Sequence, residues 1–156
     1  MTKEKDYFKS FCKISKAFGT TARKEELLIL IVESAIESME GMAACLFLAD
    51  ERQDLFVPMA QAGLSDNYLH ANPIKSRAIV KALEKEGHLA FPDAASDPRL
   101  ENHEAKKAEG IASLLTVPVR IKNHTIGVLS LYTAERRNFP APDNISARAL
   151  ADYLGI

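Results

Sequence analysis

The chain has 156 residues, of which 47% are hydrophobic and 26% are charged, so it has the size and the apolar content of one globular domain. Twenty basic residues oppose 21 acidic ones and leave a net charge of -1, without the basic block expected of a nucleic-acid-binding protein. The longest apolar run is well short of the roughly 20 residues of a membrane span. We therefore expect one cytoplasmic domain with no direct membrane contact and no nucleic-acid partner.

Two amphipathic helices are predicted before the first strand. Apolar residues recur at three- and four-residue steps from Tyr7 to Phe18 and are followed by Gly19, a typical helix stop. A second helix begins after Thr21, carries a broad apolar face and ends at Gly41. Each apolar face needs a partner, either the other helix or a sheet.

The period changes to that of strands from Ala43 onward. Two apolar stretches joined by the charged turn "DERQD" predict an antiparallel hairpin, and Pro58 indicates that its second strand lies at a sheet edge. Residues 64–75 read as a loop. Ser76 is then a candidate N-cap for a short helix over residues 77–86, which Gly87 ends.

The second half of the chain predicts a strand, a long loop, a hairpin and a helix. A brief strand at "HLAF" precedes residues 92–109, a polar segment with one or two helical turns expected between Glu101 and Ala108. The hairpin "EGIASLLTVPVRIKNHTIGVLSLYT" follows, with its turn at Asn123 and His124. A last helix is expected after Asp143.

The far end of this second hairpin is apolar on both faces, since Ile126 and Val128 share one face of the second run, with Leu129 and Leu131 on the reverse. Such strands are normally covered on both faces. The N- and C-terminal helices can cover one face, which leaves only the short helix and the loop over residues 92–109 as a lid over the other. A thin lid leaves room for a small-molecule cavity, and a tightly packed lid without a cavity is the alternative.

The predicted fold class is therefore α+β. An antiparallel sheet of five or six strands has the N- and C-terminal helices on one face, and a short helix plus a lid loop on the other.

The order and spacing of these elements resemble the GAF domain family over nearly the whole chain. The resemblance is carried by "LLILIVESAIESMEGMAACLFLAD", by "PDAASDPRL", and by the second hairpin followed by "NFPAPDNISARALADYL". In the hairpin, Gly110, Ser113, Pro118 and residues 126–129 stand where GAF domains show a Gly, a small polar residue, a Pro and an Ile-Gly-Val-Leu strand. A PAS domain, also profilin-like, would lack the paired N-terminal helices.

The resemblance implies a non-catalytic domain that senses a small molecule and regulates the output domain of a larger, bacterial signalling protein. It also implies a homodimer formed through the terminal helices. Residues 1–156 would then be one such domain excised from a longer protein. The alternative is a dimerisation or interaction module with no ligand. An enzyme is not expected, because no nucleophile, base and orienting group can be assembled from nearby residues.

The candidate ligand-binding residues are aromatic and polar side chains of the lid and of the strands beneath it. Arg99 could anchor an anionic ligand and Asp93 a polar one, but an Asp97–Arg99 contact could equally hold the loop. Serine and tyrosine hydroxyls of the hairpin would reach a ligand only if their face is the lid side. The full set is Phe47, Met59, Tyr68, His70, Asp93, Arg99, Ser113, Ser130 and Tyr132.

No cofactor is assigned. Some members of this family hold a covalent bilin on a cysteine near the lid, but Cys12 and Cys45 fall on the first helix and the first strand. The Asn-Lys-Phe-Asp-Glu signature of cyclic-nucleotide-binding members is absent, as are the several cysteines of methionine sulfoxide reductases of this fold.

No metal is expected either, because the four histidines, among them His103, are scattered. Cys45 shares a strand face with Phe47, where a free thiolate could sense oxidants or a thiol could simply fill the core.

Overall fold

The computed structural model describes residues 21–71 and 73–139, except for the side chains of residues 21–24, 70, 71 and 121. The helices predicted over residues 7–18 and after Asp143 lie outside the described residues. The described elements are α2 (Thr21–Met39), β1 (Ala43–Asp50), β2 (Leu55–Ala62), α3 (Asp66–Ala71), α4 (Arg77–Glu86), β3 (Leu89–Phe91), α5 (His103–Glu109), β4 (Ser113–Ile121) and β5 (His124–Thr133).

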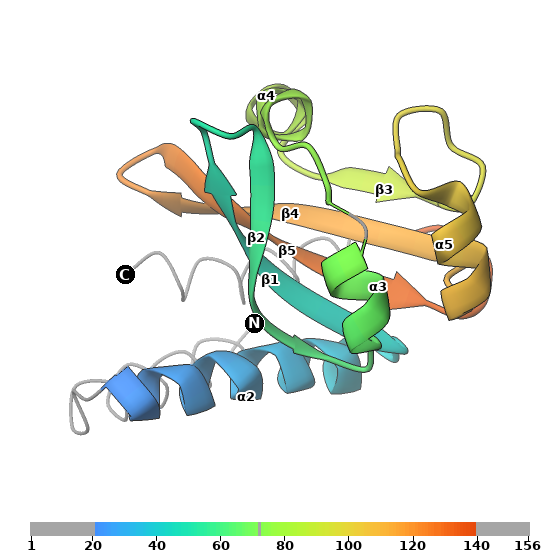
Figure 1. The fold of residues 1–156 in the computed structure, drawn as a ribbon, viewed down its shortest axis with the longest axis horizontal. Coiled ribbons are helices and arrows are strands. Elements are labelled where there is room, and N and C mark those ends of the chain that lie inside the picture. The colour runs from blue at the N-terminus through green and yellow to red at the C-terminus, as the bar shows by residue number, and fades with distance from the viewer. Residues whose placement is uncertain (1–20, 72, 140–156) are drawn as a thin grey trace.

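One five-stranded antiparallel sheet organises the fold, with the strand order β2-β1-β5-β4-β3. Helix α2 covers one face, and α3, α4 and α5 lie on the other (Figure 1). Tight hairpins join β1 to β2 and β4 to β5, as the alternation of apolar residues predicts. Strand β2, which contains Pro58, is an outermost strand, so the predicted edge position is confirmed.

Helix α2 packs its apolar stripe against the sheet. Ile31, Val32 and Ala35 are fully buried there, in a core that includes Leu46 and Leu129. Their three- and four-residue spacing places them on one helix face. The helix ends at Met39, and the chain turns back as the Gly41 N–H donates to the Ile36 carbonyl at 3.0 Å. The predicted second helix is thus confirmed, but Glu40, with φ 53°, and not Gly41 takes the left-handed conformation at its end.

The central strands bury apolar side chains on both faces, as the sequence predicts. Leu115, Val117 and Leu131 point to the core under α2, whereas Leu114 and Val128 point to the core under the lid. The sheet therefore separates two cores, and the lid-side core is the one that surrounds the candidate site.

The lid, which in the structure comprises α3, α4, α5 and the loops that join them to the sheet, differs from the sequence prediction in one segment. Residues 64–75, expected to be a loop, contain the short helix α3. Tyr68 of α3 and Leu64, two residues before this helix, are buried in the lid-side core. A six-residue helix shows too little periodicity to be recognised against the polar residues around it.

The start of α4 also differs from the prediction. Ser76 occupies the N-cap position but makes no side-chain cap hydrogen bond. Asp54, in the β1–β2 turn, instead accepts the N–H groups of Ser76 at 3.1 Å and Arg77 at 2.8 Å. A carboxylate from a distant turn therefore satisfies these helix donors. At the other end, Gly87 adopts the expected left-handed conformation, with φ 86°.

The β4–β5 turn lies one residue earlier than predicted. Lys122 and Asn123 have positive φ angles of 51° and 66°, and His124 already begins β5. The register then shifts between Val119 and Arg120. This bulge turns Ile126 toward the core under α2, although strict alternation would place it with Val128 on the lid side.

Gly127 next to this bulge lies against the backbone of β1. A Cβ atom at residue 127 would lie 2.1 Å from the Phe47 carbonyl oxygen. Gly127→Ala should therefore lower the free energy of unfolding by about 3 kcal/mol, because the backbone of a central strand cannot yield as a side chain can. Urea unfolding measures this loss.

Gly110→Ala is the matched control, because a Cβ there meets nothing within 4 Å and only the positive φ of 84° resists the change. Its expected cost is about 1 kcal/mol. Equal costs for the two substitutions would contradict the steric explanation.

Candidate functional site

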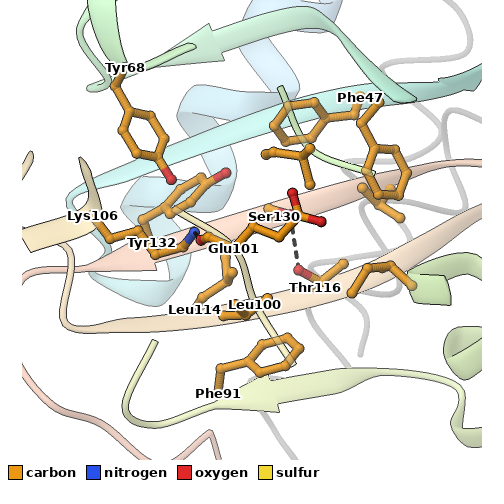
Figure 2. A pocket seen from close by; sticks show the side chains of 14 residues that line it. Phe47, Tyr68, Phe91, Leu100, Glu101, Lys106, Leu114, Thr116, Ser130 and Tyr132 are labelled. Carbon is orange, nitrogen blue, oxygen red and sulfur yellow. Dashed lines mark hydrogen bonds between the residues drawn. The ribbon is translucent and has the colours of Figure 1, made fainter. Parts of the chain in front are cut away.

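A cavity of about 40 Å³ lies between the sheet and the lid (Figure 2). Its walls come from all five strands of the sheet, from α3, α4 and α5, and from the loops before α4 and α5. The lining residues are Phe47, Phe56, Tyr68, Ile74, Ile79, Phe91, Leu100, Glu101, Lys106, Leu114, Thr116, Val128, Ser130 and Tyr132. The cavity has space for about three water molecules. Pockets for drug-sized ligands are about 300–1,000 Å³, so any larger ligand requires outward movement of the lid.

A pair of hydroxyl groups interrupts the apolar floor of the cavity. Thr116 on β4 lies directly opposite Ser130 on β5, and their hydroxyl oxygens are 3.0 Å apart. Both residues are buried. Each hydroxyl is thus satisfied by the other, as buried polar groups require, and each retains further hydrogen-bonding capacity.

Two tyrosines bring further hydroxyl groups to the cavity. Tyr68 comes from α3 and Tyr132 from β5, and both line the same cavity as Lys106 (Figure 2). Burial raises the pKa of Tyr68 to about 12, with a smaller contribution from Glu109. Burial also raises the pKa of Tyr132 well above its ordinary value. Both side chains therefore stay protonated at neutral pH and can donate hydrogen bonds.

Lys106 of α5 brings an amine into the same cavity. Its side chain is only 3% exposed, and its Nζ donates to the Glu101 carbonyl oxygen at 2.5 Å. Burial lowers the pKa of this amine to about 8, and the nearby Glu101 partly opposes the shift. At neutral pH the group is thus a buried cation that loses its proton more readily than an exposed lysine.

The sequence did not single out Lys106. The segment "HEAKKAE" is uniformly polar, so nothing distinguishes the buried Lys106 from the exposed Lys107. Only the orientation of α5 against the sheet makes the difference. The apolar lining residues, such as Phe56 and Leu100, were also missed, because an apolar side chain beside a cavity looks like any other core residue.

Four of the residues predicted to bind a ligand line the cavity together: Phe47, Tyr68, Ser130 and Tyr132. His70 lies in α3, and its side chain is outside the described part of the structure. Met59 is 47% exposed on β2, in an open surface depression that it shares with Leu48 and Val57. The other three predicted residues hold the backbone near the lid.

Arg99 lies outside the cavity and secures the loop. Its guanidinium pairs with Asp97 at 2.7 Å and stacks on the Phe91 ring, 4.4 Å from the centroid. Its hydrogen bonds lower the pKa of Asp97. The Asp97–Arg99 contact that the sequence left open is therefore present.

Asp93 and Ser113 have similar roles in holding the backbone. The Asp93 carboxylate accepts the Ser96 hydroxyl at 2.9 Å. Ser113 is fully buried, donates to the Pro92 carbonyl at 2.6 Å and accepts the Arg137 N–H at 2.8 Å. Ser113 thereby joins β4 to the segments before α5 and after β5, and it does not line the cavity.

Comparison with protein-family models gives a match to the GAF domain over residues 21–156. The chain belongs to the GAF domain family. Comparison with curated proteins gives no match.

Solved structures, among them GAF domains, share the fold at low sequence identity. The GAF domain of a phosphoenolpyruvate-protein phosphotransferase from Coxiella burnetii is 20% identical, with a TM-score of 0.73 over 94% of this chain and 89% of that one. A domain described as part of a two-component sensor histidine kinase from Sinorhizobium meliloti is 21% identical, with a TM-score of 0.72 over 84% and 87%. A GAF domain/HD domain protein from Geobacter sulfurreducens is 18% identical, with a TM-score of 0.68 over 84% and 88%.

Cys45 of this GAF domain is fully buried in the lid-side core, on the same strand face as Phe47. Burial raises the pKa of its thiol well above the ordinary value. The group thus stays a thiol at neutral pH and lacks the thiolate character that oxidant sensing needs.

Histidines and acidic residues do not assemble a metal site in the described part of the chain, where no three His, Cys, Asp or Glu side chains come together. His103 instead contacts its own loop, where its Nε2 donates to the Asp97 carbonyl oxygen at 2.7 Å. The described helices are too short or too polar to span a lipid bilayer.

The buried amine of Lys106 should make stability depend on pH. The folded-state pKa of Lys106, about 8, lies below that of a lysine in the unfolded chain. The free-energy cost of burying the charged amine is therefore fully present below pH 8 and disappears as the pH rises toward about 10.5. The free energy of unfolding of the wild type, relative to Lys106→Met, should therefore rise by about 2 kcal/mol between pH 7 and about pH 9.5. Urea unfolding at both pH values measures it.

Lys107→Met provides the control, because Lys107 is exposed and pairs with Glu104 at 3.3 Å. Its stability relative to the wild type should not change over the same pH range. A pH-independent difference for Lys106→Met would contradict the unfavourable burial of a charged amine.

Proposed function

We propose that this GAF domain is a non-catalytic sensor of a small molecule and that it regulates the output domain of a larger, bacterial signalling protein. The observation that carries the proposal is the cavity between sheet and lid, where an amine and four hydroxyl groups interrupt an apolar lining. A few convergent polar groups in an apolar cavity are typical of a ligand site. The fold is shared with a domain described as part of a sensor histidine kinase, which supports a role in signalling.

The sheet offers a route from the cavity to α2. In β5, Ser130 and Tyr132 face the cavity, while Leu129 and Leu131 pack in the core under α2. A ligand that favours one packing of the lid shifts β5, and tightly packed side chains on the other face must adjust. The signal would then reach the terminal helices, through which we propose that the domain forms a homodimer in the cytoplasm.

A dimerisation or interaction module without a ligand is the second candidate. It is favoured by the small volume of the cavity and by the exposed apolar side chains of Leu48, Val57 and Met59, which are 37%, 43% and 47% exposed. Such a module would keep the lid closed and use this surface of β1 and β2 for contacts.

A thermal-shift screen of the chain against a metabolite library separates the two candidates. A sensor should yield a compound that raises the melting temperature, since a ligand at 100 times its Kd stabilises the folded state by about 2.7 kcal/mol. Binding in the cavity should be lost or weakened at least about tenfold in Tyr68→Phe or Ser130→Ala, because each removes a hydroxyl from the lining.

Met59→Ala changes a residue outside the cavity and should leave binding unchanged. If no compound stabilises the chain, and Met59→Ala dissociates a dimer detected by analytical ultracentrifugation, the interaction module replaces the sensor.

A further inference from the structure

Resting on the proposed sensing function, we infer that the ligand is a small organic carboxylate and that Lys106 is the residue that selects it. The inference starts from the placement of one cation. The Lys106 side chain is 97% buried in the cavity wall, as its exposed fraction of 3% implies, and its amine has three N–H donors. The single hydrogen-bond acceptor that the described residues provide is the Glu101 carbonyl oxygen, at 2.5 Å.

No carboxylate among the described residues forms an ion pair with Lys106 within 4.0 Å. Glu101 lines the cavity, but its side chain is exposed, and Figure 2 shows its carboxylate directed away from the amine. An unpaired buried charge is costly, and the cost falls when an anion and further hydrogen bonds complete its surroundings. A ligand carboxylate would supply both.

The other polar groups of the cavity suit the same ligand. The Tyr68 and Tyr132 hydroxyls are protonated donors at neutral pH. An ionised carboxylate accepts hydrogen bonds at two oxygens and donates none. It therefore matches two hydroxyl donors and an ammonium group, whereas an amide of the same shape would turn an NH₂ group toward donors.

The size and the apolar lining limit the rest of the ligand. A cavity of about 40 Å³ accommodates a carboxylate with one or two additional carbon atoms before the lid must move. Phe47, Phe91 and Val128 surround this space and favour a short hydrocarbon over a second polar group. Nucleotides exceed this volume.

Binding should require the protonated amine and should therefore weaken above pH 8. The titratable groups near Lys106 are Glu101 in the preceding loop, His103 on its own helix, Tyr68 on α3 and Tyr132 on β5. Both tyrosines keep their protons in this range, since burial raises the pKa of Tyr68 to about 12 and raises that of Tyr132 as well. The pKa of Lys106, lowered to about 8, thus sets the expected loss of affinity.

The test is calorimetric titration of the chain with acetate and propionate, each beside its neutral amide, at constant ionic strength. At least one carboxylate should bind, and its amide should bind at least about tenfold more weakly, because a hydrogen bond to a charged group contributes more than one to a neutral group. Above pH 8 the affinity should fall by about tenfold per pH unit.

Three substitutions assign the effect. Lys106→Met should weaken carboxylate binding at least about tenfold and abolish its pH dependence, Lys106→Arg should keep the preference for carboxylate over amide, and Lys107→Met should change neither. Urea unfolding establishes that each variant is folded.

Equal binding of a carboxylate and its amide, or unchanged carboxylate binding in folded Lys106→Met, overturns the inference. If the panel fails while a neutral metabolite from the thermal-shift screen binds wild type and Lys106→Met alike, the inference is overturned and the sensing function stands. If neither the panel nor the metabolite library stabilises the chain, both fall.

Discussion

The fold depends on the burial of both faces of its central strands. Strands β1, β5 and β4 direct large apolar side chains to both faces of the sheet, so both faces must be covered to keep water out. On one side a single long helix, α2, does this with a continuous apolar stripe. On the other side three short helices and their loops share the task. The cavity lies between these shorter elements and the sheet.

The polar groups near this gap are of two kinds, and their surroundings differ. Ser113, Asp93 and Arg99 have their hydrogen bonds satisfied by the backbone and side chains of the lid loop, which they hold in place. Lys106 is different, because the described residues offer its amine a single acceptor. A group whose hydrogen bonds are already made within the protein gains little from a ligand. A buried cation without an ion-pair partner is stabilised when a ligand supplies an anion. This difference in satisfaction, more than the type of residue, separates supporting residues from candidate binding residues.

Periodicity in the sequence predicts most of the fold because it reports burial directly. The alternation around Leu115 and the helical spacing of Ile31 and Val32 fix the sheet, its two cores and the position of α2. The predictions failed where a feature depends on residues that are distant in the sequence or on a local irregularity of the sheet. The cap of α4 comes from Asp54 in a remote turn, and the bulge at Ile126 reverses the alternation locally. Lys106 escaped notice because adjacent lysines are indistinguishable until a helix docks.

The Phe91 ring belongs to two environments at once. It forms part of the cavity wall, and the guanidinium of Arg99, a side chain more than half exposed to solvent, lies over it. A molecule that tilts this ring on entering would displace the guanidinium that lies over it. A change inside the cavity would thereby alter the outer surface next to Asp97.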